Sequence, residues 1–102
     1  MEKLRCAVIG LGRLGYQHAA NLAGGIPQAE LVAVSDVSQS SLDRFSKDHP
    51  AVKQYRMYQD ILERDDIDAV VIASSTSSHG QVLKDTILSG KPAFLEKPLS
   101  LD

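Results

Sequence analysis

Short apolar runs alternate along this chain with segments in which apolar residues recur every three or four positions. The apolar runs predict five strands, at residues 6–9, 31–34, 52–55, 69–73 and 93–95. The other segments predict four helices. The first covers residues 13–23, the second is capped by Ser38 and ends before Pro50, the third is short and lies around residues 58–62, and the fourth is capped by Ser77 or Ser78 and ends at Gly90. This alternation predicts an α/β fold, a doubly wound parallel sheet of about five strands in the order 3-2-1-4-5.

A glycine-rich turn joins the first predicted strand to the first predicted helix. It reads Gly-Leu-Gly-Arg-Leu-Gly, from Gly10 to Gly15. Gly10 permits the tight turn, Gly12 lets backbone approach a diphosphate, and Gly15 lets the helix pack closely on the strand. The helix start, with Arg13 and Leu14 in its first turn, presents unpaired N–H groups and a partial positive charge. The turn is therefore a candidate diphosphate site of the Rossmann type.

Asp36 follows the second predicted strand, 21 residues after Gly15. A carboxylate at this place accepts hydrogen bonds from both hydroxyls of an adenosine ribose. The three residues after Asp36 include no arginine, so a 2′-phosphate would be repelled there and not neutralised. We therefore expect NAD as the cofactor in preference to NADP. Arg13 is an alternative phosphate contact, and helix capping is the alternative role for Asp36, although Ser38 is better placed to cap.

Two other kinds of glycine loop agree less well with this pattern. A P-loop requires Gly-Lys-Ser/Thr after four spacer residues, and the turn lacks that sequence. A methyl-donor site also places an acid after its second strand, but the spacing of the third glycine here suits a dinucleotide better.

Composition and charge exclude several classes of partner. The chain is 43% hydrophobic and 24% charged with a formal net charge of −2, which is ordinary for a soluble globular domain. Scattered basic residues and few aromatic residues offer no surface for nucleic acid, and no apolar run is long enough to span a bilayer. The single cysteine, Cys6, lies in an apolar strand and reads as a small buried hydrophobe with no redox or metal role. We expect a cytoplasmic protein.

Two further motifs follow the fourth and fifth predicted strands. Residues 74–79 read Ser-Ser-Thr-Ser-Ser-His, and Glu96-Lys97-Pro98 follows the last strand. Ligands of an open parallel sheet bind beyond the carboxyl ends of its strands, so one crevice would collect both motifs, the glycine turn and Asp36. The candidate cofactor contacts in these motifs are Ser74, Thr76, His79, Glu96 and Lys97. Lys97 is also the candidate catalytic group, because an ammonium stabilises a developing alkoxide; the alternative is a surface lysine paired with Glu96.

Taken together, these motifs resemble the glucose-fructose oxidoreductase/inositol dehydrogenase family (Gfo/Idh/MocA) over essentially the whole chain. The Gly-Arg-Leu-Gly turn and the Ser-Asp-Val after the second strand look most like those of inositol 2-dehydrogenases. The resemblance implies an NAD(P)-dependent oxidoreductase that moves a hydride between nicotinamide and a cyclic polyol or sugar alcohol of the myo-inositol type. It also implies that Lys97 lies beside the nicotinamide and the reacting hydroxyl, that Glu96 helps hold the cofactor, and that Thr76 and His79 line it.

The family places an aspartate and a catalytic histidine in a carboxy-terminal α/β domain, and this chain contains no such domain. We therefore expect residues 1–102 to be the amino-terminal, NAD(P)-binding portion of a longer enzyme, with little activity alone. An uncovered edge strand and exposed apolar surface predict association into a homo-oligomer. The alternative function is a non-catalytic module that senses NAD(H), against which the retained Glu96-Lys97-Pro98 argues.

Overall fold

A single parallel sheet forms the centre of the molecule. The computed structural model describes residues 3–24, 28–73 and 76–95. Its strands are β1 (Leu4–Ile9), β2 (Ala29–Ser35), β3 (Lys53–Tyr55), β4 (Ala69–Ile72) and β5 (Ala93–Leu95). They are hydrogen-bonded in the order β3-β2-β1-β4-β5, and each neighbouring pair is parallel. The predicted strand order is confirmed.

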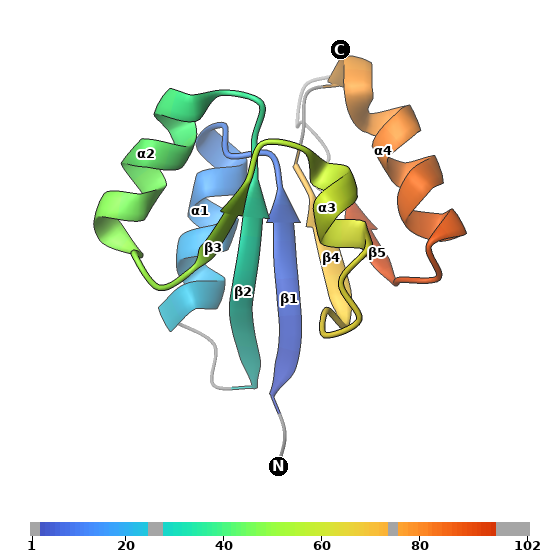
Figure 1. Cartoon of the computed structure of the whole chain (residues 1–102), viewed down its shortest axis with the longest axis horizontal. Coiled ribbons are helices and arrows are strands. Elements are labelled where there is room, and N and C mark those ends of the chain that lie inside the picture. The colour runs from blue at the N-terminus through green and yellow to red at the C-terminus, as the bar shows by residue number, and fades with distance from the viewer. Residues whose placement is uncertain (1–2, 25–27, 74–75, 96–102) are drawn as a thin grey trace.

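Helices cover both faces of this sheet (Figure 1). They are α1 (Arg13–Gly24), α2 (Gln39–Asp48), α3 (Tyr58–Leu62) and α4 (Thr76–Leu88). One core cluster joins α1 and α2 to the sheet through Ala19, Leu42 and Phe45, and the other joins α3 and α4 to it through Ile61 and Val82. Burial on both faces explains why β1 and β4 read as continuous apolar runs.

Two strands, β1 and β2, extend further than the apolar runs predict, whereas β3 and β4 are each one residue shorter. β1 begins at Leu4 and not at Cys6, because the Leu4 N–H donates to the carbonyl of Gln28 at 2.8 Å. Leu4 itself is exposed, so its side chain gives no sign of a strand. Backbone pairing decides where a strand ends, and the pattern of apolar side chains reports only the part that is buried.

Two helix boundaries were predicted with different success. Ser38 caps α2 as expected, because its hydroxyl accepts a hydrogen bond from the Ser41 N–H at 3.3 Å. The expectation that Ser77 or Ser78 caps the last helix is wrong, because α4 already begins at Thr76 and both serines lie inside its first turn. Several consecutive polar residues offer more than one cap position, and the apolar spacing does not choose among them.

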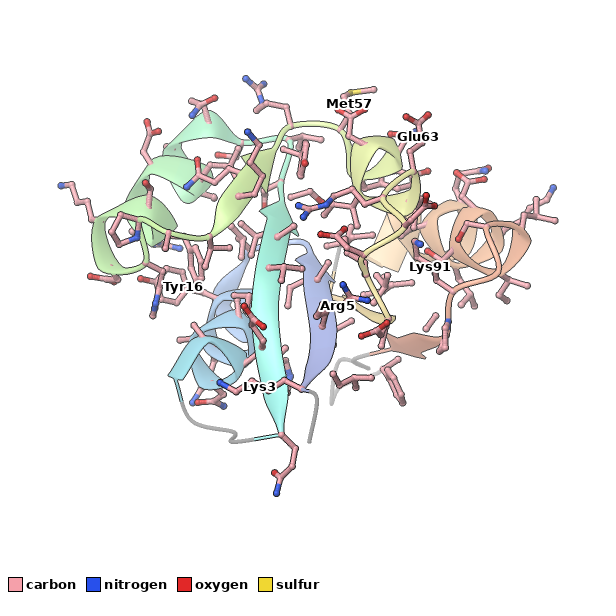
Figure 2. All side chains as sticks on the ribbon, turned by 60° about the horizontal axis from the view of Figure 1, so that its bottom comes forward. Lys3, Arg5, Tyr16, Met57, Glu63 and Lys91 are labelled. Atoms are coloured by element: carbon pink, nitrogen blue, oxygen red, sulfur yellow. The ribbon has the colours of Figure 1, made fainter. Side chains whose placement is uncertain are left out.

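The connection from α3 to β4 holds the amino end of β1. This connection includes the acidic stretch from Glu63 to Asp68, but Ile67 within it is buried. The Asp68 carboxylate accepts hydrogen bonds from the Arg5 N–H at 2.9 Å and from the Arg5 guanidinium at 3.3 Å. These bonds hold the pKa of Asp68 below its ordinary value. Figure 2 shows Arg5 on β1 beside this connection.

Candidate functional site

A cavity of about 500 Å³ opens at the carboxyl end of the sheet, beside the ends of β1 and β2. Seven of its lining residues bear on ligand binding: Gly10, Gly12, Ser35, Asp36, Val37, Arg56 and Tyr58. They come from the last residue of β2 and from the segments that follow β1, β2 and β3. Strand order reverses at β1 in this sheet, and such a reversal is where open α/β sheets bind ligands.

The three glycines of the turn differ in what their surroundings require. Gly10 has φ +101°, a conformation that favours glycine, and its N–H donates to the Ser35 carbonyl at 2.8 Å. A Cβ on Gly15 would lie 1.9 Å from the Gly10 carbonyl oxygen, so α1 packs against the turn only because Gly15 has none. A Cβ on Gly12 would meet no protein atom within 4 Å. The packing of the described residues therefore does not require glycine at position 12, and the space beside it leaves room for a ligand at the turn.

Asp36 fixes the turn from the neighbouring strand. Its Oδ2 accepts a hydrogen bond from the Leu11 N–H at 2.6 Å, and its Oδ1 accepts one from the Ser38 N–H at 2.8 Å. The sequence reasoning missed the contact with Leu11, which joins residues 25 positions apart. A carboxylate has about four acceptor positions, so about two remain for a ribose that lies in the cavity. Asp36 thus positions the turn and keeps acceptor capacity.

Ser35 adds a polar atom that the described part of the chain leaves without a hydrogen-bond partner. It lines the cavity, only 1% of its surface is exposed, and its side-chain oxygen makes no hydrogen bond within the described residues. Buried hydroxyls are normally paired, so this oxygen favours a polar ligand in the cavity. Together with Gly12 and Asp36, it makes the site chemically suited to a ribose joined to a diphosphate.

Arg56 corrects one premise of the sequence interpretation. No arginine adjoins Asp36 along the chain, but Arg56 lies in the same cavity wall because β3 is the neighbour of β2. The Asp36 N–H donates to the Tyr55 carbonyl at 3.1 Å, which brings the residue after β3 beside the residue after β2. The predicted strand order contained this signal, since it places the ends of the second and third strands next to each other.

Tyr58 is a second cavity residue that the sequence reasoning did not assign to the site. Its hydroxyl donates a hydrogen bond to an Asp85 oxygen at 2.5 Å, which links α3 to α4. Burial, and then this hydrogen bond, raises the pKa of Tyr58 to about 12. The phenol is therefore protonated at neutral pH, and its proton is engaged in the hydrogen bond to Asp85. Tyr58 forms a wall of the cavity and is poorly placed to exchange protons with a ligand.

The remaining predicted site residues are only partly within the described structure. Arg13 and Leu14 form the first turn of α1, and Thr76 and His79 lie in the first turn of α4. Ser74, Glu96 and Lys97 lie outside the described residues. Whether these motifs join the crevice stays a prediction.

The described residues contain no group of three or more histidine, cysteine or acidic side chains arranged to hold a metal ion. Within the same ranges, no helix has the length and apolar character needed to cross a membrane. Cys6 is buried as expected, and burial raises the pKa of its thiol.

Comparison with known proteins identifies the family. Residues 4–102 match an oxidoreductase family with an NAD-binding Rossmann fold. The chain belongs to the Gfo/Idh/MocA family. The predicted family is confirmed, and the domain is an NAD-binding Rossmann fold.

Several relatives in this family are inositol dehydrogenases. The chain is 41% identical over 100 residues to the scyllo-inositol 2-dehydrogenase (NAD(+)) of Bacillus subtilis, covering 98% of this chain and 29% of that protein. It is 38% identical over 99 residues to the myo-inositol 2-dehydrogenase of Thermotoga maritima, with 97% and 29% covered. A crystal structure of scyllo-inositol dehydrogenase from Lactobacillus casei with bound NAD(H) and scyllo-inositol superposes with a TM-score of 0.86 at 36% identity, over 99% of this chain and 30% of that one. The chain thus spans about 30% of the length of these relatives.

Proposed function

We propose that this chain binds NAD in the cavity beside Asp36, as the amino-terminal portion of a dehydrogenase that acts on a cyclic polyol or sugar alcohol of the inositol type. The observation that carries the proposal is the pairing of Asp36 with the glycine turn. Its carboxylate holds the Leu11 N–H and has acceptor positions left, while Gly12 leaves open space beside it. When bound, NAD supplies a nicotinamide that accepts a hydride.

The chain's own residues account for binding and orientation of the adenosine half. The turn and the start of α1 offer N–H groups to the diphosphate, and Asp36 accepts from the ribose hydroxyls. Hydrogen bonds to a charged acceptor are each worth about 1.5–3 kcal/mol, so the ribose contact contributes substantially to affinity. A 2′-phosphate would meet the negative charge of Asp36, and we therefore propose a preference for NAD over NADP.

The substrate class rests on the relatives and on Lys97. The inositol dehydrogenases named above support a cyclic polyol as hydride donor. We propose that Lys97 hydrogen-bonds the reacting hydroxyl and stabilises developing negative charge on its oxygen. Oxidation of an alcohol also requires a base for its proton and walls that orient the substrate. We expect these from a further domain, so that a longer protein containing this chain carries the turnover.

Calorimetric titration of the chain with NAD tests the binding proposal. Asp36→Ala removes the ribose acceptor and should weaken NAD binding about tenfold or more. Asp60→Ala is the matched control, because it removes an exposed carboxylate at the start of α3 and should leave the affinity unchanged. Circular dichroism must show that both variants are folded, since Asp36 also anchors Leu11. Equal NAD affinity for Asp36→Ala and wild type would contradict the proposed site.

Turnover separates the enzyme from an NAD(H)-sensing module. A longer protein that contains this chain should reduce NAD with at least one member of a panel of inositols and sugars. Tight NAD binding with no NADH formation for any member of the panel would favour the sensor instead.

A further inference from the structure

Arg56 is the one positively charged residue among the described residues that line the cavity. It follows β3 directly, and Asp36 follows β2 directly, so the two side chains of opposite charge come from neighbouring strand ends. They make no ion pair with each other within the described residues. The guanidinium therefore keeps its charge available in a wall that it shares with Asp36.

Two hydrogen bonds fix the position of this guanidinium. Its Nε donates to the Val37 carbonyl at 2.9 Å, and its Nη1 donates to the Gln39 Oε1 at 3.4 Å. Gln39 is oriented in turn, because its amide nitrogen donates to Asp43 at 2.9 Å. Part of the conformational entropy that Arg56 would lose on binding a ligand is thus already lost in the free chain.

The remaining donors of Arg56 determine what it can bind. An arginine carries five N–H donors, and the two bonds above leave three, on Nη1 and Nη2. Arg56 donates to Val37 and lines the same cavity as Asp36, so its donors lie close to the place proposed for the adenosine ribose. A planar pair of N–H groups matches a phosphate, with which arginine forms bidentate, charge-assisted hydrogen bonds.

We propose that Arg56 is a specificity-determining residue: it offers a partner to the 2′-phosphate of NADP and so limits the preference for NAD that Asp36 imposes. This inference rests on the proposed function, because it assumes that the dinucleotide lies with its ribose beside Asp36. Asp36 repels the phosphate and Arg56 attracts it, so the ratio of the two affinities depends on both side chains. A site with Asp36 alone would discriminate more strongly.

The test measures the affinities of NAD and NADP for the chain and takes their ratio. Arg56→Gln removes the charge and keeps a polar side chain, so NADP should lose about tenfold more affinity than NAD. Arg56→Lys keeps the charge without the planar fork and should restore part of the ratio. Arg44→Gln is the control for net charge, because Arg44 is exposed on α2, 5.2 Å from the ring centre of Tyr16, and is not among the residues that line the cavity. It should leave the ratio unchanged.

A second background keeps the test informative when NADP binds wild type too weakly to measure. Asp36→Asn removes the repulsion and should raise NADP affinity, and adding Arg56→Gln to it should abolish that gain. Equal losses of NAD and NADP affinity in Arg56→Gln would overturn the inference and assign Arg56 to the adenine ring. NAD binding without detectable NADP binding in Asp36→Asn would also overturn it. Absence of NAD binding to folded wild type would instead refute the proposed function.

Discussion

Gly12 and Gly15 lie in one turn, yet the structure predicts opposite consequences for replacing them with alanine. In Gly15→Ala the new Cβ would lie 1.9 Å from the Gly10 carbonyl oxygen and 3.2 Å from the Ala73 Cβ. The oxygen belongs to the backbone of a turn that is itself held by Ser35 and Asp36, so it cannot rotate away. Either α1 or the turn must move by roughly 1.6 Å, since the contact is 1.9 Å and heavy atoms that are not hydrogen-bonded rarely approach closer than roughly 3.5 Å.

The size of the Gly15 effect follows from two opposing contributions. Overpacking in a tight interior costs up to about 3 kcal/mol, and the backbone contact places this case at the upper end. Alanine has the better helix propensity, which returns about 1 kcal/mol at a position inside α1. We expect the free energy of unfolding to fall by about 2 kcal/mol, which lowers Tm by roughly 8–16 °C for a domain of this size.

Gly12→Ala serves as the matched variant. Its Cβ meets nothing within 4 Å, and Gly12 has no positive φ, so the fold accommodates alanine without strain. Alanine lowers the conformational entropy of the unfolded chain, which stabilises the fold, but it is less favourable than glycine at a helix start, which destabilises it. The two effects oppose each other, so the free energy of unfolding should change by no more than about 0.5 kcal/mol. The methyl group would nevertheless project where the diphosphate is proposed to lie, so NAD affinity should fall about tenfold or more.

Thermal unfolding followed by circular dichroism and calorimetric titration with NAD separate the two variants. The reasoning requires Gly15→Ala to lose stability and Gly12→Ala to lose affinity while staying stable. Equal Tm values for Gly15→Ala and wild type would refute the packing argument. A folded Gly12→Ala variant that binds NAD as tightly as wild type would remove the diphosphate from this turn.

Three further predictions concern acid stability, association and catalysis. The contact with Arg5 lowers the pKa of Asp68 from its ordinary value of 3.8. The stabilisation of the fold by the Asp68 carboxylate is therefore complete above pH 3.8 and is lost as the pH falls through the lower pKa of the folded state. Asp68→Asn should make the free energy of unfolding, measured with urea, less dependent on pH in this acid range. Phe94 on the edge strand β5 is 56% exposed, so Phe94→Ser should reduce self-association measured by light scattering. Met57 is 57% exposed, and Met57→Ser should leave self-association unchanged. A wild-type chain that is monomeric at high concentration would contradict this prediction. Lys97→Ala in a longer, active protein should lower kcat far more than it weakens NAD binding, and unchanged turnover would make the lysine structural.

Met57 is the matched control for Phe94, and Figure 2 shows it at the start of α3. Met57 follows β3, which lies at the opposite edge of the sheet from β5, and as the N-cap residue of α3 it makes no side-chain capping hydrogen bond. The exposed fractions of Phe94 and Met57 are nearly equal. A difference in self-association between the two variants would therefore identify the β5 region, and not exposed apolar surface in general, as the site of association.

The chain's local patterns were sufficient to predict the fold and part of the cavity lining. Alternating apolar runs and helical spacing gave the strand order, because a parallel sheet with right-handed crossovers permits few arrangements. The glycine turn and Asp36 could be predicted to lie together because their proposed functions depend on positions fixed relative to a strand end and a helix start. The helix cap at Ser38 was found for the same reason, whereas the cap before α4 was not, because consecutive polar residues compete for that place.

Tertiary structure decided which distant side chains meet around Asp36, although the predicted strand order had already placed the ends of β2 and β3 next to each other. The bond of Asp36 to Leu11 and the presence of Arg56 and Tyr58 in one cavity depend on which strand ends are neighbours and how far each extends. Apolar periodicity records which side of a strand is buried, but it carries no information about the polar side chain that lies across from it on the next strand. The sequence therefore predicted a nucleotide site at the carboxyl end of the sheet, and the pairing of β3 with β2 determined which charges surround the cavity there.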